Sequence, residues 1–385
     1  MQEEIEMKIS VYGAGKYGRY VYDEIVKNKD TKISIVCWID NFIKESKICE
    51  LPVYTEAEFL ESERFKEIDC VVVAMASTQA EEAIASLLLH EYTNIYMVLP
   101  TGLSAEIPIL TDEGNFSSFV KYYKDIKPRL SYMEIAVIHR CNLNCKRCAY
   151  FSNLEHSDWF LDVSKLESYL GQLKKKFHCI SRFNLVGGEP LLNLSLDKYI
   201  SLVRKYFPRT SIAITTNGLL IPEISQALIE TMKQCQALFY ISQYPVTRKR
   251  LEQIIDFLER EQLIYEITLP RTQFKKMLNV TNQDGKKAFE KWRRSMCTCH
   301  SIDDGRVCIC SNISRLYTMQ EYFNIHIEKE EVLISSIDLM SDEVSGWDVL
   351  KYFAQPASLC RFCSPEDALE PWETGSPKKE DWISG

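Results

Sequence analysis

The chain has 385 residues, 46% of them hydrophobic, and a formal net charge of −8. This length exceeds one ordinary hydrophobic core, so two or three domains are expected. The acidic balance and the lack of a long basic patch argue against nucleic acid or a membrane as partner and favour a small-molecule substrate. The start MQEEIEMKISVYG lacks the features of a signal peptide, and no apolar stretch reaches the roughly 20 residues of a membrane span. We therefore expect a cytoplasmic protein.

The first hundred residues alternate strand-like and helix-like segments. Buried parallel strands are predicted at KISVYG, ISIVCWID, CVVVAMAS and NIYMVLP. Polar, helix-prone segments between them fit crossover helices, which together indicate a doubly wound α/β domain. We assign residues 1–105 to this Rossmann-like domain and residues 106–130 to a connector.

A G-x-G-x-x-G motif lies at Gly13, Gly15 and Gly18, between the first strand and the first helix, and Asp40 ends the next strand. This arrangement places a diphosphate on a helix N-terminus and a ribose hydroxyl on the acid. The segment resembles the N-terminal domains of acetyltransferases acting on UDP-amino sugars, and also nicotinamide-binding domains. The resemblance implies NAD(P) or a sugar nucleotide as ligand; the alternative is a domain that keeps the turn without the ligand.

A second α/β series begins at YMEIAVIHR and continues through RFNLVGG, TSIAITTNG, LFYISQYP and IYEITLP, with helical patterns between the strands. Such repeated βα units predict a (β/α)6 partial TIM barrel over residues 131–290, with its chemistry at the carboxyl ends of the strands. From residue 291 the repeat ends and cysteines cluster. We expect a small cysteine-rich domain over residues 291–385.

Three cysteines, Cys141, Cys145 and Cys148, follow an apolar strand of the barrel series. In a reducing compartment, clustered cysteines hold metal more often than they form disulfides. One interpretation is a zinc site completed by His139 or His156, because structural zinc prefers four ligands. The other is an iron-sulfur cluster with three protein thiolates, which leaves one iron open for chemistry.

Two further motifs follow the cysteines at the ends of the next predicted strands, GGEP and TTNG. Together the three motifs resemble those of radical S-adenosylmethionine (SAM) enzymes. The resemblance implies that the three thiolates hold a [4Fe-4S] cluster, that SAM chelates the fourth iron, and that the resulting 5′-deoxyadenosyl radical removes hydrogen from a substrate. An electron donor such as flavodoxin or ferredoxin is implied as well. The cofactor-binding residues implied in the two motifs are Gly187, Gly188, Glu189, Pro190, Thr216 and Asn217.

The two glycines of GGEP let the backbone approach the cofactor, and Glu189 is suited to accept a hydrogen bond; the alternative is a plain turn at the end of a strand. One position departs from the family pattern. Arg147 stands where many family members carry an aromatic residue that packs on the adenine. Tyr150, Phe151 or the Arg147 guanidinium itself are the candidates for that stacking face.

A second cysteine group resembles the twitch or SPASM-type extensions of radical enzymes, which bind an auxiliary [4Fe-4S] cluster. The resemblance assigns the hairpin turn to Asp304-Gly305. The best four ligands on this pattern are Cys299, Cys310, Cys360 and Cys363, with Cys297 and Cys308 as competitors. The alternative is a zinc ribbon. The isolated cysteines are expected in the core, with a hydrogen-atom donor role open for two of them, Cys179 and Cys235.

The resemblance thus predicts a radical SAM oxidoreductase or epimerase. Its expected reaction is hydrogen abstraction at a carbon bearing a hydroxyl or amine on a sugar or sugar nucleotide, similar to enzymes of surface-polysaccharide biosynthesis. A radical SAM peptide maturase and a zinc-bound scaffold or nucleotide sensor are the alternatives. The sequence assigns no catalytic residue of its own.

Overall fold

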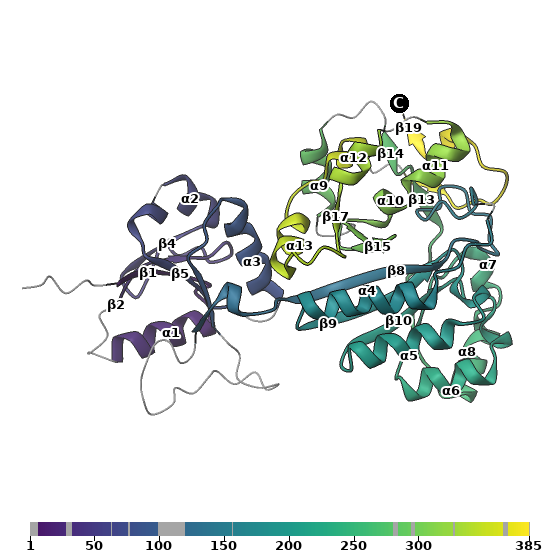
Figure 1. Cartoon of the computed structure of the whole chain (residues 1–385), viewed down its shortest axis with the longest axis horizontal. Helices are drawn as coiled ribbons and strands as arrows, with labels where there is room; N and C mark the ends of the chain where they lie inside the picture. The colour runs from purple at the N-terminus through teal and green to yellow at the C-terminus, as the bar shows by residue number, and fades with distance from the viewer. Residues whose placement is uncertain are drawn as a thin grey trace, which may run out of the picture. The chain divides into compact units, whose positions relative to one another are not determined.

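The computed structural model describes residues 7–27, 33–62, 64–75, 78–98, 120–155, 157–279, 284–293, 297–325, 328–364 and 369–384. The chain divides into two compact units, Met1–Arg129 and Leu130–Gly385 (Figure 1). The predicted end of the first domain at residue 105, most of the connector and the alternative zinc ligand His156 lie outside the described residues.

The first unit is built on a seven-stranded sheet of order β3-β4-β2-β1-β5-β6-β7. The four predicted strands are present, and β4, β2, β1, β5 and β6 run parallel as in a Rossmann-like domain. The last strand, β7, is antiparallel to β6 and comes from residues predicted as connector. The strands are β1 (Met7–Tyr12), β2 (Ile33–Ile39), β3 (Lys47–Ile48), β4 (Leu51–Tyr54), β5 (Cys70–Val73), β6 (Ile95–Val98) and β7 (Val120–Tyr122). The helices are α1 (Lys16–Lys27), α2 (Glu56–Glu61) and α3 (Thr78–Leu89).

The second unit is built on an eight-stranded sheet of order β12-β11-β10-β9-β8-β15-β16-β17. All five predicted strands of the barrel series are present: β8 (Arg129–Ile138), β9 (Cys179–Gly187), β10 (Ser211–Thr216), β11 (Leu238–Ile241) and β12 (Ile264–Ile267). The helices α4 (Val163–Lys176), α5 (Leu196–Tyr206), α6 (Gln226–Gln234), α7 (Pro245–Arg248) and α8 (Leu251–Arg260) alternate with them. Figure 1 shows α4, α5, α6 and α8 on one side of the sheet.

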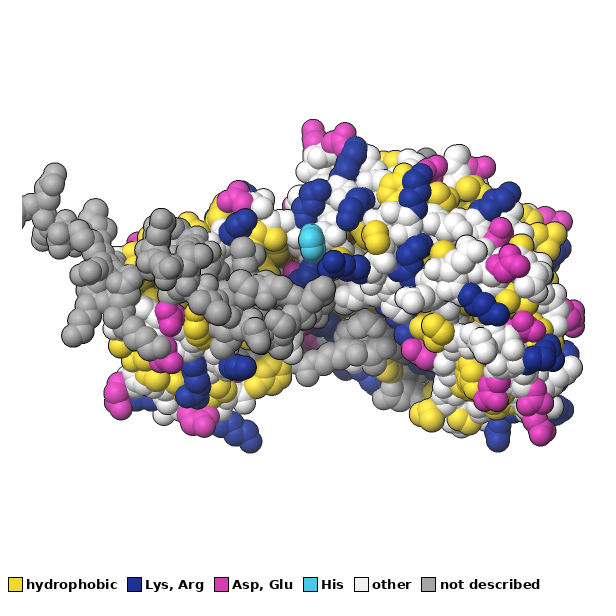
Figure 2. All heavy atoms as spheres, turned by 90° about the horizontal axis from the view of Figure 1, so that it is seen from below, with side chains coloured by type: hydrophobic (Ala, Val, Ile, Leu, Met, Phe, Trp, Pro, Cys, Tyr) yellow, Lys and Arg dark blue, Asp and Glu magenta, His cyan; other side chains and the backbone are white. Residues whose placement is uncertain are grey.

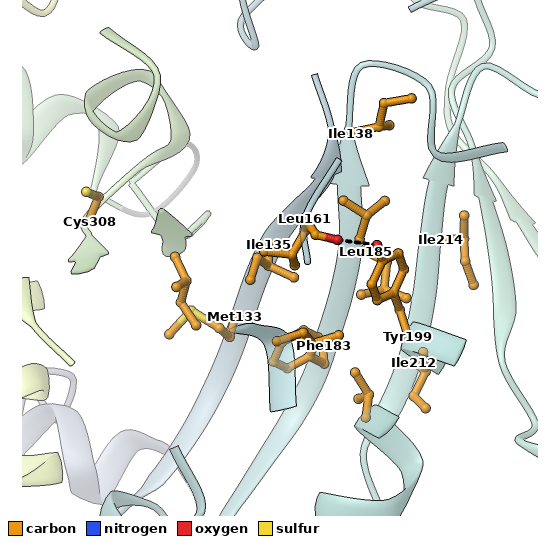
Figure 3. Packing of buried hydrophobic residues seen from close by; sticks show 14 of the residues in the cluster. Met133, Ile135, Ile138, Leu161, Phe183, Leu185, Tyr199, Ile212, Ile214 and Cys308 are labelled. Atoms are coloured by element: carbon orange, nitrogen blue, oxygen red, sulfur yellow. Dashed lines mark hydrogen bonds between the residues drawn. The ribbon is translucent and has the colours of Figure 1, made fainter. Parts of the chain in front are cut away.

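The helix-covered face of this sheet is apolar because alternate strand residues point to it. Met133 and Ile135 of β8, Phe183 and Leu185 of β9, and Ile214 of β10 are fully or almost fully buried there (Figure 3). The helices supply matching apolar stripes. In α4, for example, Asp162 caps the N-terminus through the amides of Ser164 and Lys165, and the buried residues Leu166, Tyr169, Leu170 and Leu173 follow at helical spacing.

The described residues from 284 to 353 form the next part of the second unit, which Figure 1 draws above β8. They form α9 (Gly285–Trp292), β15 (Ser301–Asp303), β16 (Arg306–Cys308), α10 (Ser311–Ser314), α11 (Leu316–Phe323), α12 (Lys329–Ile334), β17 (Ser336–Asp338) and α13 (Gly346–Phe353). The predicted turn at Asp304 and Gly305 joins β15 to β16, and both residues have positive φ. Strand β15 pairs in parallel with β8. The cysteine-rich segment therefore extends the barrel sheet beyond β8 by three strands, β15, β16 and β17, of which β15 lies next to β8.

The final residues, 369–384, return to the barrel and are here called the closing segment. Its strand β18 (Leu369–Pro371) pairs with β13 (Gln273–Lys275), and its strand β19 (Ile383–Ser384) pairs with β14 (Leu278–Asn279). On the face seen in Figure 2, lysines and arginines are interspersed with acidic residues. Among the helices that the structure describes, none has the length and apolar character needed to cross a membrane.

Candidate functional site

The first three cysteines lie in the loop that follows β8, and their thiols are close enough to influence one another. The amide of Leu143 donates a hydrogen bond to Sγ of Cys141 (3.3 Å). Burial, Glu189 and the other two thiols raise the pKa of Cys141, and burial with Cys148 raises the pKa of Cys145 to about 12. Thiolates crowded in a buried loop need a neighbouring positive charge, which a bound metal centre provides.

The GGEP motif packs directly on the start of the cysteine loop. A Cβ at Gly187 would lie 2.0 Å from the carbonyl oxygen of Ile138, and one at Gly188 would lie 2.0 Å from that of Arg140. The amides of Gly188 and Glu189 donate to these same carbonyls, each at 2.9 Å. Both glycines are therefore required by the close approach of two main chains, in addition to any approach of a cofactor.

Glu189 joins the second motif to the third. Its buried carboxylate accepts hydrogen bonds from Thr216 Oγ1 (2.6 Å), the amide of Asn217 (2.9 Å) and the amide of Leu191 (3.1 Å). Asn217 then reaches the cysteine loop, where its Nδ2 donates to Asn142 Oδ1 (2.6 Å) and lies 3.9 Å from Sγ of Cys141. Pro190 is buried at the start of the following 3-10 turn. The three predicted motifs thus meet at the carboxyl ends of β8, β9 and β10.

The closing segment holds the cysteine loop from the other side. Trp372 Nε1 donates to Sγ of Cys145 (3.2 Å), and Trp382 Nε1 donates to the carbonyl of Cys148 (2.9 Å). The main chain also pairs here, since the amide of Lys146 donates to the carbonyl of Glu373 (2.9 Å). This role of the last residues was not predicted from the sequence; two tryptophans in a polar C-terminal stretch were the available signal.

Arg147, the departure from the family pattern, belongs to this contact. Its guanidinium donates to the carbonyl of Pro371 (3.2 Å) and lies 3.7 Å from Glu370. Of the predicted alternatives for adenine stacking, Phe151 is fully buried in the core, and the hydroxyl of Tyr150 donates to Glu134. Arg147 therefore anchors the closing segment, whereas adenine stacking by Tyr150 stays a prediction.

His139, the alternative zinc ligand, faces other groups. Its ring stacks on Trp159 with centroids 3.7 Å apart, and Nδ1 lies 2.6 Å from the guanidinium of Arg315. Burial and the charge of Arg315 lower the pKa of His139 to about 3, against the opposing effect of Glu155. The imidazole is held by this guanidinium rather than aimed at the three thiols.

The face of the barrel sheet that is turned away from the helices is polar. Tyr132 donates to Glu134 (2.6 Å), and Asn184 Nδ2 donates to the Tyr132 hydroxyl (2.7 Å) and to Thr215 Oγ1 (3.2 Å). Arg182 Nε donates to Asn184 Oδ1 (3.2 Å). Strand register places Arg182, Asn184 and Thr215 on one face, and the hydrogen bonds join Tyr132 and Glu134 to them.

This hydrogen-bonded network extends to the far strands of the sheet. Arg182 pairs with Glu266 of β12 (3.1 Å), and its guanidinium lies 4.8 Å from the ring centroid of Tyr240. We call these residues the polar face: Tyr132, Glu134, Arg182, Asn184, Thr215, Tyr240 and Glu266. The polar face was not predicted from the sequence, although a glutamate and an asparagine inside otherwise apolar strands were signals of it.

Four cysteines of the second group are neighbours in the structure. Burial and then Cys360, Cys363 and Cys297 raise the pKa of Cys310. Burial, Cys363 and Cys360 likewise raise the pKa of Cys297 to about 12. Gly285, at the start of α9, packs against the main chain of Cys360 and Arg361. A Cβ added at Gly285 would lie 2.8 Å from the amide nitrogen of Arg361. The structure thus groups Cys297, Cys310, Cys360 and Cys363.

The remaining candidates of that group face elsewhere. Cys299, one of the four preferred ligands, contributes to the raised pKa of Cys297, but its own pKa shows no such influence of Cys310, Cys360 or Cys363. Burial and then Glu134 raise the pKa of Cys299, against the lowering effect of Thr298 and Arg271. Cys308 is buried, with Asp303 as its main charged neighbour. Of the isolated cysteines kept as hydrogen-atom donors, Cys179 begins β9 at the opposite end of the sheet and Cys235 caps the C-terminus of α6.

The N-terminal glycine motif has the expected local geometry. Gly13 has φ +102°, and a Cβ on Gly18 would lie 1.9 Å from the carbonyl oxygen of Gly13, whereas one on Gly15 would meet nothing within 4 Å. Gly15 thus leaves open space at the start of α1. Asp40, however, directs its buried carboxylate to the amides of Ala14 (2.9 Å) and Phe42 (2.9 Å), and not into that space.

The cysteine chemistry fits the implied cofactor. Among the described residues, no three His, Cys, Asp or Glu side chains are positioned to hold a single metal ion. A [4Fe-4S] cluster does not need such convergence, because each thiolate binds a different iron. Cys141, Cys145 and Cys148 would hold the cluster, and the joined GGEP and TTNG motifs lie beside them.

Comparison with known proteins identifies the central region. Residues 135–260 match the model of the Radical SAM superfamily. A GTP 3′,8-cyclase from Sulfurovum sp. (strain NBC37-1) is 29% identical over 99 residues, and one from Alkaliphilus oremlandii (strain OhILAs) is 32% identical over 103 residues. Each match covers 26% of this chain, and the chain spans 30% and 32% of the length of these two relatives.

Solved structures give distant similarity. A crystal structure of BtrN in complex with AdoMet and 2-DOIA is 17% identical, covers 64% of this chain and 100% of that chain, and has a TM-score of 0.37. Native anSMEcpe with bound AdoMet is 20% identical, covers 36% of this chain and 43% of that chain, and has a TM-score of 0.30.

Proposed function

The chain contains a radical SAM domain, and from this premise we propose that it removes hydrogen from a small carbohydrate or sugar-nucleotide substrate, with oxidation or epimerisation as the outcome. When bound, SAM and the [4Fe-4S] cluster supply a carbon-centred radical that abstracts hydrogen. The residues of the chain determine what that radical meets. Substrate, outcome and the role of each site residue belong to the proposal.

The polar face is the observation that carries the proposed substrate class. It lies on the face of the barrel sheet turned away from the helices, along the strands whose carboxyl ends carry the three motifs. It presents a carboxylate, an amide, hydroxyls and a guanidinium. Buried polar groups at fixed positions recognise hydroxyl and amine groups by hydrogen bonding and reject ligands that lack them. A polyhydroxylated or amino-substituted small molecule fits this donor and acceptor set.

We assign the auxiliary cluster to Cys297, Cys310, Cys360 and Cys363. Four thiolates saturate a [4Fe-4S] cluster, so this centre would have no open iron and would serve in electron transfer. If the outcome is oxidation, such a centre can take the second electron from the substrate radical.

A second candidate substrate is a purine nucleotide. The relatives named GTP 3′,8-cyclase favour it, but they match only about a quarter of this chain, within the radical SAM region. GTP therefore belongs in the same test as the sugar nucleotides.

The test is formation of 5′-deoxyadenosine by the anaerobically reconstituted full chain with SAM and dithionite. UDP-N-acetylglucosamine, UDP-glucose, dTDP-glucose, GTP and a mixture of unstructured peptides are compared with a reaction without addition. A rise with one sugar nucleotide, together with a mass change or an epimer in the recovered sugar, supports the proposal. An increase in 5′-deoxyadenosine with GTP or peptide alone overturns the proposed carbohydrate or sugar-nucleotide substrate. Cys49→Ala, at an exposed cysteine of the first unit, is the control for Cys145→Ala.

A further inference from the structure

Cys299 lies next to the polar face through the pairing of β15 with β8. The amide of Glu134 donates to the carbonyl of His300 (2.8 Å), and Ser301 is the register partner of Glu134. Because side chains alternate along an extended chain, Cys299 falls beside Tyr132 and on the same face as Glu134. His300 points to the opposite face, where it stacks on Phe353 with centroids 3.5 Å apart.

The electrostatic influence between Cys299 and its neighbours agrees with this placement. Burial and then Glu134 raise the pKa of Cys299, and Cys299 in turn contributes to the raised pKa of Tyr132 and of Tyr150. Four side chains, from β8, the cysteine loop and the segment before β15, are therefore neighbours. We call Tyr132, Glu134, Tyr150 and Cys299 the interior cluster.

The interior cluster holds the buried carboxyl group of Glu134, and the guanidinium of Arg271 acts on its Cys299. Glu134 is 4% exposed and accepts hydrogen bonds from the hydroxyls of Tyr132 and Tyr150. Among the ion pairs of the described residues, none includes Glu134. Burial raises its pKa to about 7, against the lowering effect of the two hydroxyls. A carboxyl group in this setting can hold and release a proton near neutral pH.

We propose that Cys299 is not a cluster ligand but a free thiol that donates a hydrogen atom to the substrate radical, with Glu134 as its proton source. The substrate carbon gains a C–H bond as the S–H bond of Cys299 breaks, which leaves a sulfur-centred radical. One electron from a low-potential donor of the flavodoxin or ferredoxin class and one proton from Glu134 restore the thiol. Glu134 then takes a proton from solvent.

This inference rests on the proposed function and selects one of its two outcomes. The proposal includes that Cys299 returns the hydrogen to the face opposite the one from which it was removed, which inverts the carbon and makes the reaction an epimerisation. With the electron that cleaves SAM, each turnover consumes two electrons and one proton and converts SAM into 5′-deoxyadenosine and methionine. The substrate itself is neither oxidised nor reduced.

The free-thiol part is tested by iron and sulfide analysis of reconstituted full-length variants. Cys299→Ser and Cys297→Ser form a matched pair two residues apart. We expect Cys299→Ser to keep the parent's iron content and Cys297→Ser to lose the second cluster, so that iron falls from about eight to about four per chain on [4Fe-4S] stoichiometry. Loss of the second cluster in Cys299→Ser, with retention in Cys297→Ser, overturns the assignment.

The donor part is tested without any substrate, by cleaving SAM with dithionite in D2O. The thiol of Cys299 is then S–D, and we expect part of the 5′-deoxyadenosine to carry one deuterium in the parent. In Cys299→Ala this fraction should fall to natural abundance, while Cys179→Ala and Cys235→Ala, whose thiols lie away from the interior cluster, should match the parent.

Equal deuterium in the parent and in Cys299→Ala overturns the donor role, as does its absence from the parent product. If the parent forms no 5′-deoxyadenosine at all, the radical SAM activity itself fails, which separates that failure from a failure of the Cys299 assignment.

Discussion

The indole N–H of Trp372 donates a hydrogen bond of 3.2 Å to Sγ of Cys145, across 227 positions of the sequence. Trp372 also stacks on Tyr244, with centroids 6.1 Å apart and planes 20° apart. The closing segment thus acts on the first cysteine loop in two ways, by bracing its main chain and by placing a donor on one of its sulfurs. Hydrogen bonds to ligand sulfurs tune the potential of an iron-sulfur cluster.

The first prediction concerns Trp372→Phe. The lost N–H···S bond leaves more charge on the Cys145 sulfur, which destabilises the reduced cluster and makes its midpoint potential more negative. The shift should be on the order of 40 mV, because such a bond is worth about 1 kcal/mol and about 59 mV corresponds to a tenfold change for one electron. Potentiometric titration followed by electron paramagnetic resonance measures it.

The control for Trp372→Phe is Trp38→Phe, which removes an indole hydrogen bond to a main-chain carbonyl (3.0 Å) in the first unit. It should leave the potential unchanged. An unchanged potential in Trp372→Phe would show that the indole only packs against the loop.

The second prediction concerns the pH dependence of stability. The pKa of Glu134 is about 7 in the folded chain and 4.5 is its ordinary value, so the folded state binds the proton more tightly. The contribution of Glu134 to the free energy of unfolding is therefore fully present below about pH 4.5 and is lost as the pH rises to about 7. The loss is about 3 kcal/mol, for a pKa difference of 2.5 units at about 1.4 kcal/mol per unit. Glu134→Gln should remove this part of the slope.

Urea unfolding of the second unit within the full chain, followed from pH 5 to pH 8, measures that slope. Glu252→Gln, on an exposed position of α8, serves as the control and should keep it. If Glu134→Gln keeps the slope of the parent, the carboxyl group is ionised in the folded state throughout this range.

The third prediction separates two glycines of the N-terminal motif. Gly18→Ala should destabilise the first unit by about 1–3 kcal/mol, because its Cβ would lie 1.9 Å from the carbonyl oxygen of Gly13. Gly15→Val faces open space and should leave the melting temperature close to that of the parent while weakening nucleotide binding. Calorimetry with UDP-N-acetylglucosamine and with NADH measures binding.

If the parent binds either probe and Gly15→Val binds it equally well, the glycine loop is not the binding site. Asp40 makes this test necessary, because its carboxylate is hydrogen-bonded to the loop amide of Ala14 (2.9 Å) instead of facing the open space.

The strands and motifs of the barrel were predictable because local pattern determines them. Strand-like segments with helical patterns between them located β8 to β12, and the spacing of Cys141, Cys145 and Cys148 with GGEP and TTNG indicated chemistry at their carboxyl ends. The structure also gives the glycines of GGEP a packing role, since the carbonyl oxygens of Ile138 and Arg140 occupy the space that side chains would need.

Long-range contacts were not predictable from local pattern. The pairing of β15 with β8 places Cys299 beside Tyr132 and on the same face as Glu134, and spacing alone could not distinguish it from Cys297, since both belong to the same CTC sequence. In the same way, the role of Arg147 depends on Pro371 and Glu370, more than 220 positions away. Sequence spacing identifies a cysteine cluster, but the sheet register decides which thiol belongs to it.

The central claim is that three thiolates of the β8 loop hold a cluster that cleaves SAM, and Cys145→Ala tests it most directly. The measurement is 5′-deoxyadenosine formed by reconstituted protein with SAM and dithionite, alongside iron and zinc content. We predict no product in Cys145→Ala, with about four irons per chain retained at the auxiliary site on [4Fe-4S] stoichiometry. Undiminished 5′-deoxyadenosine in Cys145→Ala, or a parent protein that holds zinc and no iron, would contradict the account.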